Sequence, residues 1–398
     1  MNYAALIIIV MLLSSGTYAR SNRFGLTDIN SSPFKNIQTI DYSAIKNLLN
    51  EYISNRPDST PFLDQKRRKA WAENIAKTSA KNFRILDFAG DTSAVGFFEH
   101  LKGDPSFASK MRIEETTVEE LKRKKTNQLF SYQIFSNSFV NKPSILIWAK
   151  EHGDEFSTAE FVNELTEFFI FHLESRGRNE VNLVVQDIFS RINIVVIPDM
   201  NPDKTVEAME AGTIIAEDFN AFGQLLQPFN YDSDNSDDYV VAPEARFFKK
   251  VATELKDVIL GIDLHAPFST PVMTYPHKSI EEKNRFLIAE ASNTSFCQLN
   301  LGERKISEEC QTGKFRTSHP QVSFNPANAP SFLSRSRGIP TMLLEISGEE
   351  PSDPRKNRDC EFAGKDKTCA YYSAKPHLKD YLPFFLRLME IMGYWYEK

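Results

Sequence analysis

A histidine and a glutamate three residues apart, His152 and Glu155, follow a short apolar run at residues 144–149. A run of that length predicts a buried strand, and the apolar spacing of residues 158–173 predicts a helix behind it. The pair would then lie at the carboxyl end of a strand, where open α/β sheets place their ligand sites. Imidazole and carboxylate are both zinc ligands, so the two side chains could bind one metal from a single loop.

Two later strand ends carry groups of the same kind. His265 closes one apolar run of strand length, and Glu345 interrupts another. With His152 and Glu155, His265 makes a set of two histidines and one carboxylate that leaves a fourth position on zinc open, as catalytic sites do. Glu345 would be the remaining carboxylate, able to take a proton from an attacking water and pass it to a leaving amine.

Each of these residues alone has a simpler explanation. A lone histidine–x–x–glutamate is common by chance, and a histidine at a strand end is more often a partly buried polar residue than a ligand. Glu345 is different, because an unpaired carboxylate in an apolar strand is costly to bury and predicts a partner or a function. The combination is more specific than any member, because several catalytic roles are filled at once.

The bulk composition is that of a globular protein. The chain has 398 residues, of which 41% are hydrophobic and 25% charged, so it can bury a large core. Its net charge of −6 argues against a nucleic-acid partner. The basic run at 122–125 is interpreted as a solvated helix face, and the acidic run at 232–238 as a solvated loop, since it lacks the spacing of a calcium site.

Apolar runs of strand length alternate with helically spaced segments. Strands are predicted at residues 128–136, 144–149, 192–198, 258–265 and 339–346, and helices at 42–53, 158–173, 242–255, 278–291 and 378–396. This alternation predicts an α/β fold, with a mixed, mostly parallel twisted sheet and helices on both faces. We expect residues 20–40 to be irregular and residues 41–398 to form one domain, with charged, solvated insertions around 64–125. The alternative is an N-terminal activation segment that is later removed.

The N-terminus has the pattern of a secretory signal. Residues 4–13 are apolar but too short to span a bilayer, and small residues follow up to Ala19. We therefore expect residues 1–19 to be removed, and the mature chain, in which no membrane span is expected, to be secreted or lumenal. Asn30 and Asn293 begin glycosylation acceptor sequences, which fit secretion.

The four cysteines fit an oxidising compartment. Cys297 lies close to Cys310 in the sequence, and Cys360 close to Cys369, so local pairing is the simplest of the three connectivities. A zinc site made of all four cysteines is the alternative, but no C-x-x-C spacing occurs.

The order of these motifs resembles that of the zinc metallocarboxypeptidases. The matching residues are His152-Gly153-Asp154-Glu155, Asn201-Pro202-Asp203, Asp218-Phe219-Asn220, His265 and Glu345, over roughly residues 40–398. The resemblance implies that the fold is zinc-carboxypeptidase-like and that one zinc ion per chain is held by His152, Glu155 and His265. It also implies that Asp218 orients His152, that Asn220 faces a peptide or small amide substrate, and that Glu345 is the catalytic base.

The sequence departs from the family at residues that bind the substrate. Ala221 stands where the family has an arginine that binds the substrate's terminal carboxylate, and Lys204 is the only basic residue where a second arginine is expected. Phe324 stands near the position of a tyrosine, and the candidate replacements for the arginines are Arg316, Arg335 and Arg337. The sequence thus predicts a secreted zinc hydrolase of amide or peptide bonds. The alternatives are a zinc deacylase of N-acyl amino acids or small amides, and a non-catalytic protein that retains zinc.

Overall fold

A single mixed sheet forms the centre of the molecule. The computed structural model describes residues 24–37, 39–55, 65–86, 129–136, 142–153, 155–204, 243–265, 272–274, 278–299, 307–318, 329–345 and 375–396. The strands within these ranges are β1 (Phe24–Asp28), β2 (Phe83–Leu86), β3 (Ser131–Ile134), β4 (Ser144–Ala149), β5 (Asn193–Ile197), β6 (Val258–His265), β7 (Val272–Thr274), β8 (Lys314–Ser318) and β9 (Thr341–Glu345). They lie in the order β1-β8-β7-β9-β6-β4-β5-β3-β2.

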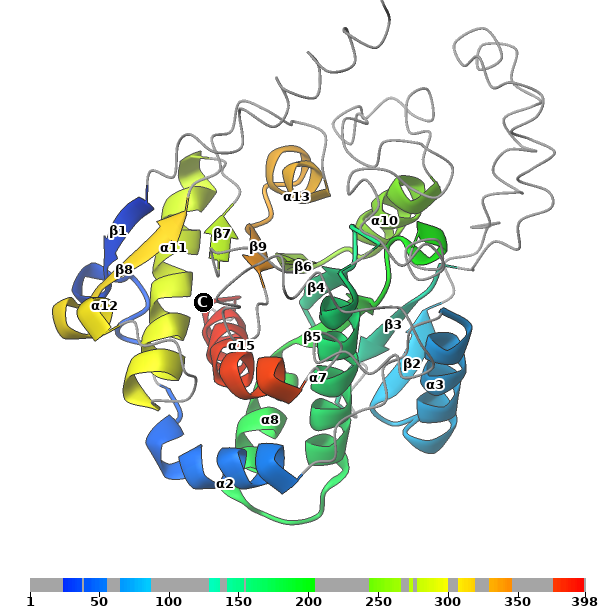
Figure 1. Ribbon diagram of the computed structural model, residues 1–398, viewed down its shortest axis with the longest axis horizontal. Helices are drawn as coiled ribbons and strands as arrows, with labels where there is room; N and C mark the ends of the chain where they lie inside the picture. The colour runs from blue at the N-terminus through cyan, green and yellow to red at the C-terminus, as the bar shows by residue number, and fades with distance from the viewer. Residues whose placement is uncertain are drawn as a thin grey trace, which may run out of the picture.

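The middle of this sheet is parallel and its two ends are antiparallel. Strand β4 pairs in parallel with β5 on one side and β6 on the other, and β6 pairs in parallel with β9. Antiparallel pairs join β1 to β8 at one end and β2 to β3 at the other (Figure 1). The chain leaves β4 towards β5 and later returns to its opposite side as β6, so the carboxyl end of β4 is the point where the strand order reverses. Ligands bind at such points in open α/β sheets.

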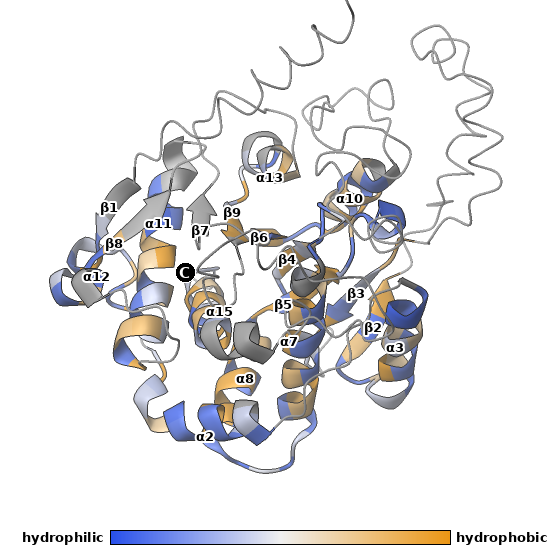
Figure 2. Cartoon of the chain, viewed as in Figure 1, coloured by the Kyte–Doolittle hydropathy of each residue, from blue (hydrophilic) through white to orange (hydrophobic). Residues whose placement is uncertain are grey.

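Helices cover both faces of the sheet, as the sequence predicts. The helices are α2 (Tyr42–Asn55), α3 (Gln65–Thr78), α7 (Phe156–Glu174), α8 (Glu180–Arg191), α10 (Pro243–Glu254), α11 (Lys278–Ser292), α12 (Ser307–Thr312), α13 (Ala329–Ser331) and α15 (Lys375–Tyr396), with short 3-10 or π turns η1 (Ile29–Ser31), η2 (Asn293–Gln298) and η3 (Phe332–Ser336). The larger core cluster joins α2, α7, α8, α11 and α15, and the smaller one joins α10 to η3. Both α7 and α10 carry hydrophobic as well as hydrophilic residues (Figure 2), as expected for helices that cover a sheet.

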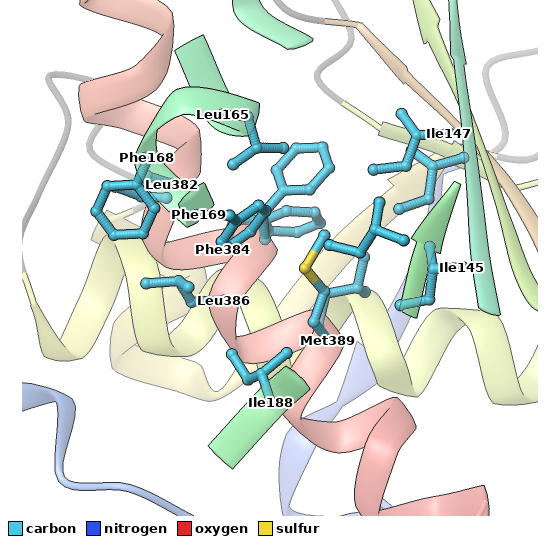
Figure 3. Packing of buried hydrophobic residues seen from close by; sticks show 14 of the residues in the cluster. Ile145, Ile147, Leu165, Phe168, Phe169, Ile188, Leu382, Phe384, Leu386 and Met389 are labelled. Carbon is cyan, nitrogen blue, oxygen red and sulfur yellow. The ribbon is translucent and has the colours of Figure 1, made fainter. Parts of the chain in front are cut away.

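The residues of β4 alternate between these two core clusters. Ile145 and Ile147 belong to the larger cluster, where they face α15 and α7 (Figure 3), whereas Leu146 and Trp148 belong to the smaller one. Trp148 packs edge-on against Phe248 of α10, with ring centroids 4.8 Å apart. Side chains of a strand alternate in this way with a period of two residues, so β4 is fixed from both faces. The loop that follows it therefore starts from a rigid point.

Two expectations about the N-terminal part are wrong. Residues 24–28, within the segment expected to be irregular, form β1 and pair with β8. Helix α3, expected to be solvated, buries one face, because Arg68, Ala72 and Ile75 recur at helical spacing and are at most 9% exposed. The charges of the remaining face hide this pattern in the sequence. Residues 87–125, the rest of the charged insertions expected around 64–125, lie outside the described residues.

The predicted disulfide between Cys297 and Cys310 is confirmed. It joins η2 to α12, and its Cα atoms are 5.5 Å apart. Cys360 and Cys369 lie outside the described residues. None of the described helices combines the length and the apolar composition that a membrane span requires. Of the two acceptor asparagines, Asn30 is exposed in η1 and Asn293 begins η2.

Candidate metal centre

The predicted site residues meet at the carboxyl edge of the parallel strands. His152 and Glu155 lie in the loop between β4 and α7, and His265 is the last residue of β6. Glu345 is the last residue of β9 and the register partner of His265. The backbone of Glu345 is thus beside the histidine, while its side chain lies outside what the structure describes. Asp218 and Asn220, with Ala221 and Phe324, also lie outside the described residues.

Glu155 lies between the two histidines and uses a different oxygen for each. Its Oε1 is 2.8 Å from Nδ1 of His152, and its Oε2 is 3.3 Å from Nδ1 of His265. The two Nδ1 atoms are themselves 3.2 Å apart. Glu155 and His265 are buried, whereas the side chain of His152 is 15% exposed, so the cluster reaches solvent on the His152 side.

These three side chains fit a zinc ion. Zinc bonds of about 2.0–2.2 Å at tetrahedral angles place the ligand atoms about 3.3–3.6 Å apart. The separations of 3.2 and 3.3 Å around His265 are close to the lower end of this range, and the 2.8 Å between His152 and Glu155 is that of a direct hydrogen bond. The buried Oε2 of Glu155 accepts no hydrogen bond from the described residues, so this atom has a place for a cation. Two imidazoles and one carboxylate are also a common donor set of catalytic zinc.

The electrostatics of the cluster favour a positive charge at this point. Burial alone would lower the pKa of His152, but the carboxylate of Glu155 outweighs it and raises that pKa from 6.5 to about 9. Burial would also lower the pKa of His265, but the carboxylates of Asp263 and Glu155 outweigh it and raise that pKa well above its ordinary value. For Glu155 itself, burial would raise the pKa, but the two histidines lower it to about 2. A metal cation carries the charge that this carboxylate stabilises.

Hydrogen bonds join the loop after β4 to the loop after β5. Met200 donates its backbone N–H to the carbonyl of Ala149, at 3.0 Å, and the side-chain amide of Asn201 donates to the carbonyl of Glu151, at 3.1 Å. The Asn-Pro-Asp motif therefore has a visible role, since its asparagine holds the backbone next to His152. Asn201 in turn donates its backbone N–H to Oδ1 of Asp199.

The backbone of the metal loop is held in an unusual conformation. Lys150 has a φ of 65°, the left-handed region that costs a residue with a side chain about 1–3 kcal/mol. Its ammonium group is fully buried and lies 3.3 Å from Oδ2 of Asp199, an ion pair that compensates for the burial of both charges. Burial nevertheless lowers the pKa of Lys150 to about 8. The buried ion pair between Lys150 and Asp199 thus stabilises the sharp turn after β4.

Two acidic residues behind His265 were missed by the sequence analysis. Asp263 is buried, and its Oδ1 is 3.1 Å from Nε2 of His265. Glu151 is also buried and belongs to a second group, with Asp263 and His265, whose ligand atoms lie within 4.8 Å of one another. Burial and then the charge of Asp263 raise the pKa of Glu151 to about 7. A usable signal existed for Asp263, because it is a carboxylate in an apolar strand, as Glu345 is.

The arginines considered as replacements for a substrate clamp lie in β8, in η3 and directly after η3. Arg316 belongs to β8 and Arg335 to η3. Arg337 donates from its guanidinium to the backbone carbonyl of Ala252 in α10. That bond fixes Arg337 to the smaller core cluster, so it is a poor candidate for a substrate ligand.

Comparisons with known proteins bear on the fold. No protein-family model matches the sequence, and neither does any curated protein. Among solved structures, thrombin activatable fibrinolysis inhibitor matches with 12% identity, a TM-score of 0.52, and coverage of 88% of this chain and 80% of that chain. A metallo-carboxypeptidase from Burkholderia cenocepacia matches with 13% identity, a TM-score of 0.49, and coverage of 83% and 69%. Carboxypeptidase A from Helicoverpa armigera matches with 11% identity, a TM-score of 0.49, and coverage of 87% and 80%. Identities this low support a conclusion about the fold alone, and that conclusion rests on the match to thrombin activatable fibrinolysis inhibitor.

Proposed function

Because the chain has a metallocarboxypeptidase-like fold, we propose that it is a zinc-dependent hydrolase of amide or peptide bonds. His152, Glu155 and His265 would hold one zinc ion. The observation that carries the proposal is their convergence, within 4.8 Å of one another, at the point of the sheet where the strand order reverses. A chance histidine–x–x–glutamate pair has no reason to meet a second buried histidine there.

The two glutamates of the site would have different roles. A zinc ion held by His152, Glu155 and His265 would supply Lewis acidity, which can lower the pKa of a water to about 7 and polarise a carbonyl. Glu155 stays ionised, because its pKa is about 2, and offsets part of the metal charge. Glu345, beside His265 in the sheet, would take a proton from the attacking water and deliver it to the leaving amine.

The substrate would be a peptide or another small amide. Ala221 stands where the resemblance places the arginine that binds a free terminal carboxylate. Among the described residues, Arg337 donates to the backbone of α10 instead. This observation keeps a second candidate, a deacylase that cleaves an N-acyl amino acid or small amide at the same centre. A protein that retains zinc but has lost catalysis is the third.

We also propose that the protein works outside the cytosol. The Cys297–Cys310 disulfide supports this location, since such bonds persist in oxidising compartments. The N-terminal signal pattern and the acceptor sequences at Asn30 and Asn293 point the same way.

Metal content and hydrolysis test the proposal together. Elemental analysis should find one zinc ion per chain, and the loaded protein should hydrolyse blocked peptides, free C-terminal peptides or N-acyl amino acids. Turnover of N-acyl amino acids without turnover of peptides would select the deacylase. Protein without stoichiometric zinc would refute the metal site and every candidate that depends on it.

A pair of variants separates catalysis from zinc retention. Glu345→Gln should lower the rate by roughly 10²–10⁴-fold with zinc retained, because the amide cannot accept the proton. Glu254→Gln is the matched control, since this carboxylate is exposed in the last turn of α10 and should leave the rate unchanged. Zinc without turnover on any of these substrates, and Glu345→Gln equal to its parent, would leave only the non-catalytic protein.

A further inference from the structure

Asp263 is a buried carboxylate directly behind one of the candidate ligands. It precedes His265 by two residues in β6, so both side chains leave the strand on the same face. Its register partners are Trp148 in β4 and Leu343 in β9, and only 1% of the residue is exposed. A carboxylate in this place is costly to bury unless it has a partner or a function.

The two ring nitrogens of His265 face different groups. Nδ1 faces the candidate zinc position, at 3.2 Å from Nδ1 of His152 and 3.3 Å from Oε2 of Glu155. Nε2 lies 3.1 Å from Oδ1 of Asp263; both atoms are buried, and neither has another hydrogen-bond partner among the described residues. A neutral imidazole has one N–H and one lone pair, and a metal can bind only the nitrogen that has the lone pair. The group next to Nε2 therefore decides whether Nδ1 can bind.

We propose that Asp263 is the positioning residue of His265: it keeps the ring proton on Nε2 and presents the lone pair of Nδ1 to the metal. A carboxylate accepts hydrogen bonds and cannot donate one when ionised, so it stabilises this tautomer and raises the basicity of the ligand nitrogen. The proposal rests on the zinc-binding role of His265 proposed above. It assigns Asp263 to His265, whereas the family resemblance assigns Asp218 to His152.

Asp263 is enclosed, which lets it hold the ring in one orientation. Trp148 and Leu343 flank it in the neighbouring strands, and a carboxylate oxygen of Glu151 lies within 4.8 Å of its own. The backbone of Glu151 is itself fixed, because Asn201 donates to its carbonyl oxygen. With only 1% of its surface exposed, Asp263 is held beside His265.

Zinc affinity measured against a chromophoric chelator tests the proposal without relying on activity. Asp263→Asn should weaken zinc binding by roughly 10–100-fold, the usual effect of losing such a partner. The amide is a weaker acceptor, and it can turn its NH₂ group towards Nε2, which would move the ring proton to Nδ1 and block the metal. The matched control is Glu390→Gln, because Glu390 is equally buried but pairs with Arg387 in α15 and not with a candidate ligand. This variant should bind zinc as the parent does.

Two outcomes of the titration would overturn the assignment. If the parent binds one zinc and Asp263→Asn binds it within twofold of the parent, Asp263 does not position His265, although the proposed function still stands. If the parent binds two zinc ions and Asp263→Asn binds one, Asp263 is itself a ligand, with Glu151 and His265. A parent that binds no zinc refutes the proposed function as well.

A measurement on the unmodified chain covers the case in which Asp263→Asn does not fold. Long-range ¹H–¹⁵N correlation spectra of the zinc-loaded protein report which nitrogen of each imidazole is protonated. His265, identified by the signal that its substitution removes, should be protonated on Nε2. A proton on Nδ1 of His265 would contradict the proposal directly.

Discussion

Gly153, between the two ligands of the metal loop, has no room for a side chain. A Cβ at this position would lie 2.6 Å from Cβ and 2.7 Å from Cγ of Lys204, and 2.9 Å from the backbone carbon of the same residue. The Cβ and the backbone carbon of Lys204 do not move with the side-chain rotamer, so a change of rotamer cannot relieve these two contacts. The loop after β4 and the loop after β5 therefore touch at a point where only glycine fits.

Gly153→Ala should therefore disturb both stability and zinc binding. Restoring ordinary contact, which begins at 3.4 Å, requires an opening of about 0.8 Å. Overpacking of this kind costs about 1–3 kcal/mol in the free energy of unfolding. Metal–ligand distances tolerate only about 0.2 Å, so the displacement of His152 or Glu155 should also weaken zinc binding by roughly tenfold or more.

Gly177→Ala is the matched control for this substitution. The nearest atoms to a Cβ there are 3.6 and 3.7 Å away, which is ordinary contact. The loss of chain entropy in the unfolded state should make this variant as stable as the parent or slightly more so. Urea unfolding and zinc titration of both variants would measure the difference. A Gly153→Ala protein with the stability and zinc affinity of Gly177→Ala would refute the close packing of the two loops.

Two further predictions concern protons and buried charges. Zinc binding should strengthen as the pH rises from 6.5 to about 9, because His152 must release the proton that Glu155 stabilises. Over the same range the zinc-free protein alone should lose stability in urea unfolding. The raised pKa of His152 contributes its full stabilisation below pH 6.5, and this contribution is lost as the pH rises through 9. An equal loss with zinc bound would contradict this. Arg68→Ala should lower the free energy of unfolding by about 3–5 kcal/mol, because it removes a guanidinium that lies 3.2 Å from the buried carboxylate of Glu160. Lys66→Ala, at an exposed position of the same helix, should change it by less than about 0.5 kcal/mol. Similar values for both variants would show that the buried pair contributes little.

The parallel centre of the fold could be predicted because its strands are short apolar runs. The predicted bounds of residues 144–149 and 258–265 agree with β4 and β6 to the residue. Those strands are covered on both faces, so nearly every residue is apolar and the run itself marks the element. The acid or histidine at the end of such a run stands out for the same reason, and this led to His265 and Glu345.

Elements at the sheet ends could not be predicted in the same way. Strands β1 and β8 pair with each other over residues 24–28 and 314–318, far apart in the sequence. Their sequences, FGLTD and KFRTS, mix polar and apolar residues too briefly to show a period. Helix α8 was also missed, although Asn179 caps its first turn and accepts a hydrogen bond from the backbone N–H of Asn182. Pairing partners and tertiary packing, which define these elements, are not local properties of the sequence.

The N-terminal elements bear on whether this part of the chain is a removable segment. Strand β1 pairs with β8 at one end of the sheet, β2 pairs with β3 at the other, and Arg68 of α3 forms a buried ion pair with Glu160. Glu160 lies in α7, little more than one turn after the candidate ligand Glu155. Cleavage that released residues 24–86 would uncover two strand edges and remove Arg68 from the buried carboxylate of Glu160, at a cost of several kcal/mol. We therefore propose that these residues are an integral part of the catalytic domain and not an activation segment.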